Sequence, residues 1–446
     1  MNFIEAEKYL NALQMHKIKL GLEAMQSFLA KVGSPERRLR FVHVAGTNGK
    51  GSVCATLLTA LEQARFRVGM YTSPHFSTVR ERIRLNDEYI SEEAFAKLAE
   101  KVIDVLDAEA ITYFEFVTAV ALLWYEQKQP DLVILETGMG GRLDATNVVT
   151  PLVSVITSIS MDHQAYLGDT LAAIASEKAG IIKENIPVVA VGGSAEVVRV
   201  LTDTARKKHA PIYLLGRDFF HENENAPEDP SFWRWHGQTA PLSGTIAGLA
   251  CGIKGAYQHE NAALAVAALQ LLAGHGFKVN EQILRAALLA VRWPGRLEFF
   301  QLIGPALHQI LPSVNVSAAK FLLDGAHNPD GVEKLAATLR ADYAGLPITL
   351  LWGAMSDKDN RASLSCLTPL CQHVILTRVA GERAAEPELL LDCMPEIERH
   401  KAVLARQPVD ALTKAVGLAE EMGLVVIAGS LYLLGELRPM LLGEIA

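Results

Sequence analysis

Apolar stretches rich in β-branched residues alternate with longer segments of helical period up to about residue 209. Short apolar runs are typical of buried strands, and apolar positions three and four residues apart are typical of amphipathic helices. We expect strands at 41–45, 68–72, 132–136, 153–159 and 188–191, and helices at 50–63, 92–107, 114–127, 171–182 and 196–209. Because strands separated by helices usually pair in parallel, this pattern predicts a mostly parallel, helix-covered sheet.

The pattern changes in the second half of the chain. Residues 216–255 are rich in Pro, Gly, Asn, Asp and Trp and lack helical period, which predicts short strands and turns. Helical period then returns and ends at the WPGR segment, 293–296. A second alternation follows, with strands expected at 320–323, 348–352, 373–377 and 424–428. We therefore predict an α/β protein with a P-loop-type, mostly parallel sheet domain over 1–295 and a smaller Rossmann-like domain over 296–446.

Composition narrows the class of protein. Half of the 446 residues are hydrophobic and 21% are charged, which is enough apolar surface for more than one core. The net charge of −8 provides no overall basic field, so we expect no nucleic-acid partner. Apolar runs stop short of the roughly 20 residues that span a bilayer, and the start of the chain does not resemble a signal peptide. Five scattered cysteines without a C-x-x-C pair fit a cytoplasmic location.

The sharpest chemical motif is FVHVAGTNGKGS, in which an expected strand meets a glycine-rich turn and then a helix. Glycine N–H groups and the helix N-terminus favour phosphate binding, and Lys50 can reach the outer phosphates. The motif departs from G-x-x-x-x-G-K-[ST], because Val44 replaces the first glycine and Gly51 separates Lys50 from Ser52. An ordinary glycine-rich turn is the alternative, but the flanking strand and helix favour a nucleotide site.

Other polar groups follow expected strands. Glu136 ends the strand in DLVILETGMGGRLDATN, where an acid can hold a magnesium ion bound to ATP or simply cap a helix. Asp162 and His163 follow the next strand. The Glu177–Lys178 pair lies late in a helix and, taken alone, is typical of a solvated charge pair.

The predicted second domain repeats this arrangement. Asp324, His327 and Asn328 follow one of its strands, and Asp357, Lys358 and Asp359 follow another. Two domains that carry polar groups at strand ends favour a cleft for a nucleotide and a second substrate.

Taken together, the motifs resemble a known family. GTNGKGS, TSPH, TYFEF, LETGMGGRLDATN, MDHQAYLG, EKAGIIK, PGRLE and LDGAHNP occur in the order seen in folylpolyglutamate synthase and dihydrofolate synthase, members of the Mur ligase superfamily. The match runs from about Gly46 to Ser430. It implies an enzyme that converts a carboxylate to an acyl phosphate with ATP and then joins it to the amine of L-glutamate.

The resemblance also implies roles for individual residues. ATP would contact Thr47, Asn48, Gly49, Lys50, Gly51, Ser52, Asn261, Arg296, Asp324 and His327. Magnesium, with two ions expected, would be held by Ser73, Glu136, His163 and Lys178. Lys178 matches a lysine that is carbamylated in the superfamily. The pterin-bearing substrate would contact Thr112, Tyr113, Phe114, Glu115, Leu143, Asp144 and Ala145. Lys178, His163 and Lys50 are the expected catalytic residues.

Several hypotheses about the activity stay open. The leading one is addition of L-glutamate to dihydropteroate, to the γ-carboxylate of reduced folates, or to both. Lys19 stands where the family usually has an acidic residue near the pterin site, so folylpolyglutamate synthesis alone is an alternative. A ligase for a cell-wall precursor is another, and a P-loop NTPase without ligase activity is more distant. We expect a monomeric cytoplasmic enzyme with small-molecule partners and no membrane association.

Overall fold

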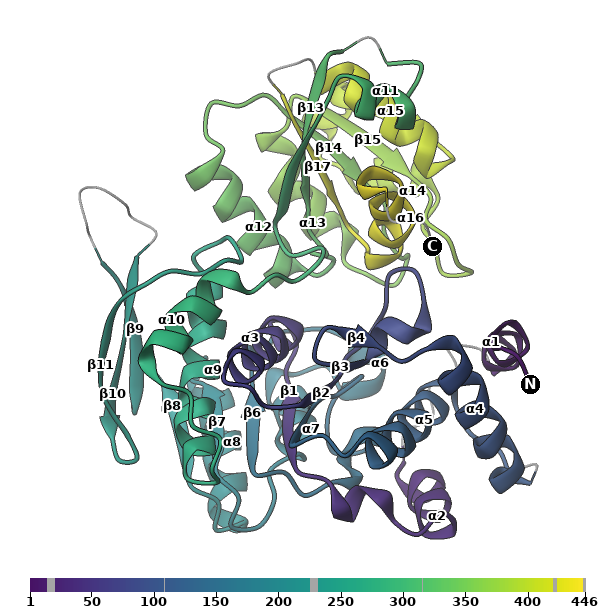
Figure 1. The fold of residues 1–446 in the computed structure, drawn as a ribbon. Coiled ribbons are helices and arrows are strands. Elements are labelled where there is room, and N and C mark those ends of the chain that lie inside the picture. The colour runs from purple at the N-terminus through teal and green to yellow at the C-terminus, as the bar shows by residue number, and fades with distance from the viewer. Residues whose placement is uncertain (14–20, 108, 225–231, 315, 420–422, 444–446) are drawn as a thin grey trace. The chain divides into compact units, whose positions relative to one another are not determined.

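The computed structural model describes residues 1–13, 21–107, 109–224, 232–314, 316–419 and 423–443. The chain divides into two compact units, each with its own sheet (Figure 1). The first unit comprises Met1–His75, Val79–Gly252 and Gln258–Arg292. The second comprises Phe76–Thr78, Ile253–Tyr257 and Trp293–Ala446. The chain therefore leaves the first unit three times, twice for short segments.

The first unit is built on a sheet of eleven strands in the order β11-β10-β9-β8-β7-β6-β1-β5-β2-β3-β4. The strands are β1 (Phe41–Ala45), β2 (Val68–Tyr71), β3 (Ile83–Leu85), β4 (Glu88–Tyr89), β5 (Leu132–Glu136), β6 (Val153–Ile156), β7 (Val188–Val191), β8 (Ile212–Leu215), β9 (Phe219–Asn223), β10 (Trp233–Thr239) and β11 (Leu242–Leu249). The strands from β2 to β9 along this order pair in parallel, and antiparallel strands extend the sheet at both sides. Central β1 is buried along its whole length, which explains its nearly continuous apolar run.

Helices cover this sheet. They are α1 (Phe3–Ala12), α2 (Glu23–Lys31), α3 (Lys50–Gln63), α4 (Glu92–Leu106), α5 (Tyr113–Lys128), α6 (Gln164–Leu167), α7 (Leu171–Ala179), α8 (Ala195–Lys207), α9 (Gln258–Ala273) and α10 (Glu281–Ala290), with short 3-10 turns η1 (Pro35–Arg38), η2 (Val79–Arg82) and η3 (Ala145–Val148). Helix α3 packs against α9 and α10, α5 against α4, and α7 against α8. None of the helices in the described ranges is long and apolar enough to cross a membrane.

The second unit has six strands in the order β12-β13-β17-β14-β15-β16, and only β12 is antiparallel to its neighbour. Its elements are β12 (Glu298–Ile303), α11 (Pro305–Ile310), β13 (Ala318–Leu323), α12 (Pro329–Asp342), β14 (Ile348–Trp352), α13 (Asn360–Leu367), η4 (Thr368–Leu370), β15 (His373–Thr377), α14 (Pro387–Cys393), η5 (Glu396–Lys401), β16 (Ala402–Ala405), α15 (Pro408–Ala419), β17 (Leu424–Ala428) and α16 (Leu431–Leu442). One apolar core contains side chains of α12, α13 and α14, and a second contains side chains of α11, α15 and α16. The sheet is therefore covered by helices on both faces.

The predicted α/β fold class is confirmed, with a large, mostly parallel sheet followed by a smaller one. The predicted strands within 216–255 are also present, as β9, β10 and β11. Strand β6 ends at Ile156, earlier than the predicted residue 159, because the next residues bond to the glycine-rich loop instead of to a strand. The Thr47 N–H donates to the Ser158 carbonyl at 2.7 Å, and the Thr157 hydroxyl donates to the Asn48 carbonyl at 2.7 Å.

Candidate active site

The glycine-rich loop between β1 and α3 is held in shape by its neighbours. A Cβ on Gly46 would collide with the Thr157 side chain, and a Cβ on Gly49, where φ is +91°, would collide with the Asn261 side chain. Glycine is therefore required at both positions. The loop leads directly into the N-terminus of α3, where unpaired N–H groups favour an anion.

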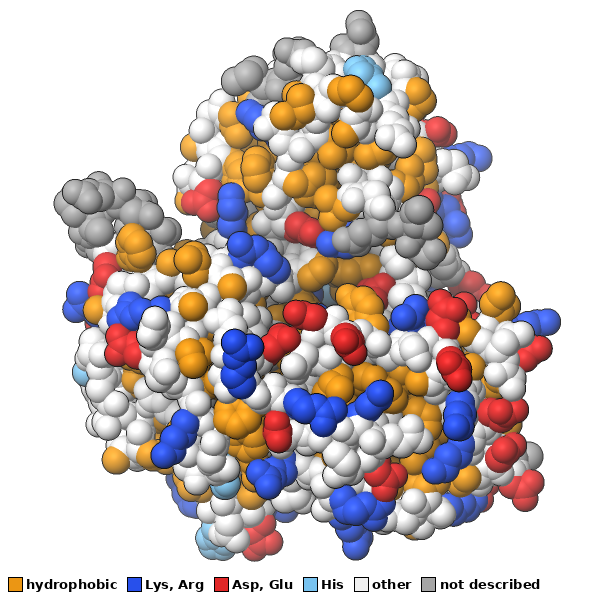
Figure 2. All heavy atoms as spheres, viewed as in Figure 1, with side chains coloured by type: hydrophobic (Ala, Val, Ile, Leu, Met, Phe, Trp, Pro, Cys, Tyr) orange, Lys and Arg blue, Asp and Glu red, His pale blue; other side chains and the backbone are white. Residues whose placement is uncertain are grey.

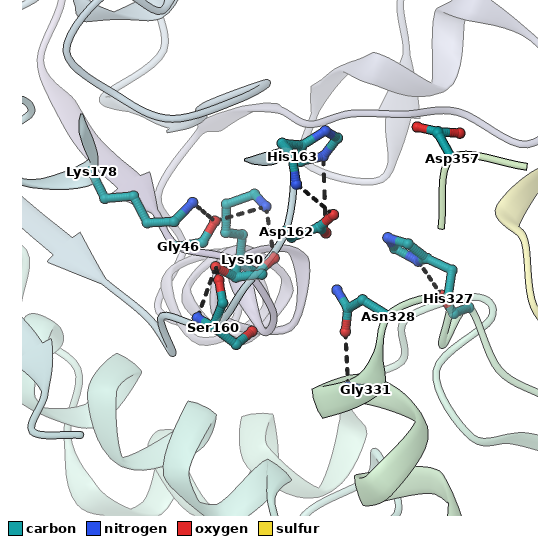
Figure 3. A network of polar contacts seen from close by, with 12 residues as sticks. Gly46, Lys50, Ser160, Asp162, His163, Lys178, His327, Asn328, Gly331 and Asp357 are labelled. Carbon is teal, nitrogen blue, oxygen red and sulfur yellow. Dashed lines mark hydrogen bonds and ion pairs between the residues drawn. The ribbon is translucent and has the colours of Figure 1, made fainter. Parts of the chain in front are cut away.

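Two lysines meet at the Gly46 carbonyl oxygen. Lys50 Nζ donates to it at 3.2 Å and Lys178 Nζ, from α7, donates to it at 2.8 Å, as Figure 3 shows. Burial, and next the positive charge of Lys50, lowers the pKa of Lys178 to about 7. The charge of Asp162 opposes this shift. The structure thus brings together two of the predicted catalytic residues.

Glu136 provides a buried carboxylate beside this loop. It ends β5, its Oε2 accepts from the Ser73 N–H at 3.1 Å, and its Oε1 lies 3.9 Å from Lys50 Nζ. Two predicted magnesium ligands, Ser73 and Glu136, are therefore in direct contact. Lys178 joins them only indirectly, through the Gly46 carbonyl and Lys50.

His163, the other predicted magnesium ligand, lies in the loop after β6. Its N–H donates to Asp162 Oδ1 at 2.8 Å, and its Nε2 lies 3.9 Å from Asp162 Oδ2 (Figure 3). Within the described ranges, no three His, Cys, Asp or Glu side chains form a metal-binding group. The predicted ligands still fit magnesium. They include the Glu136 carboxylate and the Ser73 hydroxyl, and Mg²⁺ commonly takes its remaining oxygen ligands from phosphates and water.

Three residues predicted to contact the pterin, Tyr113, Phe114 and Asp144, lie with Tyr71 and Gly138 in what we call the acceptor cluster. The Phe114 ring fills the space that a Cβ on Gly138 would need, and it lies 5.9 Å from the Tyr71 ring. Asp144 is buried and flanked by half-buried Leu143 and buried Ala145. Thr112 and Glu115 form the capping box of α5, which fixes the start of the helix that carries Tyr113 and Phe114.

A buried chain of hydrogen bonds supports Asp144. Its Oδ1 accepts from the Thr146 hydroxyl at 2.5 Å, and its Oδ2 accepts from the Met139 N–H at 2.9 Å. Burial raises the pKa of the Asp144 carboxyl. The Thr146 hydroxyl donates its proton to Asp144, so its oxygen can only accept from His43. His43 Nε2, 2.9 Å away, is therefore the protonated ring nitrogen. Sequence reasoning missed His43 and Thr146; a histidine inside the apolar run of β1 was the available signal.

The loop that carries Asp144 is fastened to the end of α7, the helix that carries Lys178. Arg142 donates through its backbone N–H to the Glu177 carbonyl at 2.7 Å and through Nη2 to Glu177 Oε1 at 2.8 Å. Asn147 Nδ2 donates to the carbonyl of Gly180 at 3.1 Å. Glu177 therefore pairs with Arg142, and its neighbour Lys178 is buried, so the two are not the solvated pair that the sequence alone suggested.

Lys19 lies outside the described residues. Asn261 belongs to the first unit, where its Nδ2 donates to Gln258 Oε1 at 2.8 Å.

The remaining predicted nucleotide contacts belong to the second unit. Asp324 follows β13 and accepts from the N–H groups of Leu297 and Ala326, each at 2.9 Å. Burial raises the pKa of Asp324, although the Arg296 charge opposes the shift. Arg296 lies against Gly325, and His327 Nδ1 donates to the Gly325 carbonyl at 2.7 Å (Figure 3). Arg296, Asp324 and His327 thus form one polar group at a strand end.

Comparisons with known proteins place this geometry in a family. The Mur ligase middle domain matches residues 44–269, and the Mur ligase, glutamate ligase domain matches residues 309–431. The dihydrofolate synthase/folylpolyglutamate synthase of Bacillus subtilis is 34% identical, over 98% of both chains. The chain belongs to this family of Mur ligases. The ligase is ATP-dependent, and the predicted folate activity is confirmed at the level of the family, which removes the cell-wall and NTPase alternatives.

Solved structures agree with this assignment. FolC from E. coli in complex with DHPP and ADP is 30% identical to the ligase, with a TM-score of 0.85 over 98% of this chain and 97% of that one. A bifunctional folylpolyglutamate synthase/dihydrofolate synthase with Mn, AMPPNP and L-glutamate bound is 28% identical, with a TM-score of 0.83 over 99% and 98%. ADP, AMPPNP, Mn, L-glutamate and DHPP are thus ligands of proteins that share this fold.

Proposed function

We propose that this ligase adds L-glutamate both to dihydropteroate and to reduced folates, through one site in which ATP activates the acceptor carboxylate. The observation that carries the proposal is the meeting of Lys50 and Lys178 at the Gly46 carbonyl, with the Glu136 carboxylate 3.9 Å from Lys50. Phosphoryl transfer between two anions needs positive charge held in position. Lys50 would supply one such charge, and Glu136 and Lys178 would supply more by holding magnesium.

The glycine-rich loop would hold the phosphates of ATP. Residues Thr47–Ser52 and the N-terminus of α3 would surround the phosphate oxygens, while the Thr47 N–H stays on the Ser158 carbonyl. Lys50 would turn from the Gly46 and Thr47 carbonyls to the outer phosphates. Asn261 of the first unit, and Arg296, Asp324 and His327 of the second, would contact the rest of the nucleotide.

Magnesium would be held by Ser73, Glu136, His163 and a modified Lys178. When bound, magnesium neutralises phosphate charge and orients the transferred group. The Lys178 side chain is buried and forms no ion pair with a described acidic residue. Addition of CO₂ to its neutral amine, with loss of a proton, would convert it into a carbamate at the glycine-rich loop. The carbamate would be a second negatively charged ligand besides Glu136, which would allow the site to hold a second magnesium ion.

The acceptor would bind along the acceptor cluster, with its pterin near Phe114 and Asp144. A buried carboxyl whose two oxygens are already aligned by Thr146 and Met139 is well placed to hydrogen-bond a flat heterocycle, and Phe114 offers a ring on which it can stack. The alternative is folylpolyglutamate synthesis alone, which the lysine at position 19 favours. We also expect the ligase to act as a cytoplasmic monomer.

Phosphate release with ATP, Mg²⁺ and L-glutamate tests this proposal. Dihydropteroate and tetrahydrofolate are compared as acceptors, and each product is identified by mass. Release with both acceptors is the expected result. Release with tetrahydrofolate alone would establish the single activity, and release with neither would contradict the proposal.

A further inference from the structure

A buried arginine lies next to the acceptor cluster without an acidic partner. Arg82 ends η2 and is only 4% exposed. Its Nε donates to His75 Nδ1 at 2.8 Å, and its guanidinium carbon lies 5.4 Å from the centre of the Tyr113 ring. No side chain in the described ranges forms an ion pair with Arg82, whereas Arg80 and Arg84 on either side each pair with an acid.

The two carboxylates of the acceptor cluster and its helix, Glu115 and Asp144, have hydrogen-bond partners other than Arg82. Glu115 accepts from the Thr112 backbone at 2.8 Å and from its hydroxyl at 2.7 Å. Asp144 accepts from Thr146 and Met139. A guanidinium has five N–H donors, and leaving a buried charge unpaired is unfavourable. The described residues therefore leave the Arg82 charge unbalanced, and a carboxylate of a ligand would balance it.

We infer that Arg82 binds a carboxylate of the pterin-bearing substrate, while His75 and Tyr113 hold the guanidinium in place. The inference rests on the proposed function, in which the acceptor lies along the same cluster. An arginine suits a carboxylate because its planar fork can form two parallel hydrogen bonds. Dihydropteroate has one carboxylate, the reacting one. In a folate that carboxyl is already an amide and the carboxylates are those of the glutamate, so either source supplies the same chemistry.

The test compares the binding of dihydropteroate with that of its carboxamide, in EDTA and without ATP, so that no metal contributes. Arg82→Met keeps an apolar stem against Tyr113 and removes the charge. We expect it to weaken dihydropteroate binding about 10- to 100-fold, the usual range for a charge-assisted pair, and to leave carboxamide binding unchanged. Arg82→Lys should recover part of the loss, and ATP affinity should not change.

Arg84→Met is a matched control. Arg84 lies on β3, its guanidinium is 5.5 Å from the Tyr89 ring, and it pairs with Asp87. It therefore shares the cation–ring contact of Arg82 but has an acid of its own, and its loss should leave both ligands' affinities unchanged.

Repeating the measurement with tetrahydrofolate identifies the carboxylate. If Arg82→Met binds both acceptors more weakly, Arg82 pairs with the reacting carboxylate of dihydropteroate and with the carboxylate that takes its place in tetrahydrofolate. If it binds only tetrahydrofolate more weakly, Arg82 pairs with a glutamate carboxylate. Equal loss of acid and carboxamide binding, or no loss at all, would overturn the inference in favour of a structural role. Should Arg82→Met not fold, the wild-type enzyme is used instead. The inference is overturned if it binds dihydropteroate no better than its carboxamide and tetrahydrofolate no better than the diamide of its glutamate. Ligation by the wild type, measured first, tests the proposed function separately.

Discussion

At the scale of single residues, the charge on Lys178 decides what the site can bind. The amine is buried beside Lys50, its hydrogen bond goes to a neutral carbonyl, and no acidic side chain of the described residues forms an ion pair with it, although the charges of Asp162 and Asp144 act to raise its pKa. A carbamate would reverse the sign and supply a metal ligand.

We predict that Lys178→Ala lowers the ligation rate at least 100-fold, of the order expected when a ligand of a catalytic metal is lost. Ligation is measured by phosphate release, and circular dichroism checks that the fold is kept. Turnover near the wild-type rate that does not respond to bicarbonate would show that no carbamate is needed.

His43 makes stability depend on pH. Burial lowers the pKa of folded His43 to about 3, while an unfolded histidine titrates near 6.5. Between these values the unfolded chain binds a proton that the folded chain does not. Proton binding by the unfolded chain lowers the free energy of unfolding. The stability that neutral, buried His43 permits is therefore fully present above about pH 6.5 and is lost as the pH falls toward 3.

We predict that His43→Gln reduces the loss of unfolding free energy between pH 7.5 and pH 5.0 by about 2 kcal/mol, the value for one group at these pKa values. Urea denaturation at the two pH values measures it. The same pH dependence in variant and wild type would mean that His43 is not excluded from protonation in the folded state.

At the scale of elements, the contact between α7 and the loop after β5 joins the metal side of the site to the acceptor side. Gly180, just after α7, has an ordinary helical φ of −62°, but a Cβ there would collide with the backbone of Arg142. The loop that carries Asp144 can reach its place only because this position has no side chain.

We predict that Gly180→Ala costs about 1–3 kcal/mol of stability, as overpacking does, and raises the KM for the acceptor more than that for ATP. Gly417→Ala is the control. No atom lies within 4 Å of a Cβ there, and alanine should stabilise α15 by about 0.5–1 kcal/mol. Thermal unfolding and initial rates measure both effects. Unaltered stability and KM in Gly180→Ala would show that the loop tolerates displacement.

Elements with a strong local signal could be predicted from the sequence. Strand β1 and helix α3 have the expected bounds, because the apolar run and the glycine-rich turn mark both. Strand β12 was not predicted, since its residues alternate between half-buried and exposed and do not form the buried apolar run of the strands that were predicted. Lys50, Glu136 and Lys178 lie in motifs, whereas Arg82 lies in a polar stretch and matters only through its tertiary neighbours.

At the scale of the whole molecule, both kinds of charge are spread over the surface that Figure 2 shows, as the modest net charge implies. The units themselves are less simple than the two consecutive domains we predicted. The short segments Phe76–Thr78 and Ile253–Tyr257 are part of the second unit, although long stretches of the first unit flank them. Tertiary packing decides to which unit these short segments belong, and the period of hydrophobic residues in the sequence does not predict it.

These two segments complete the second unit's packing. The Phe76 ring occupies the space beside Gly295, its carbonyl lies against Gly435, and the Lys254 ammonium is 4.7 Å from the centre of the Phe299 ring. A protein made of residues 293–446 alone would therefore have packing cavities at the positions of these side chains. Chimeras between relatives face the same constraint. An exchange of residues 293–446 must also include residues 76–78 and 253–257 to keep the native packing of the second unit.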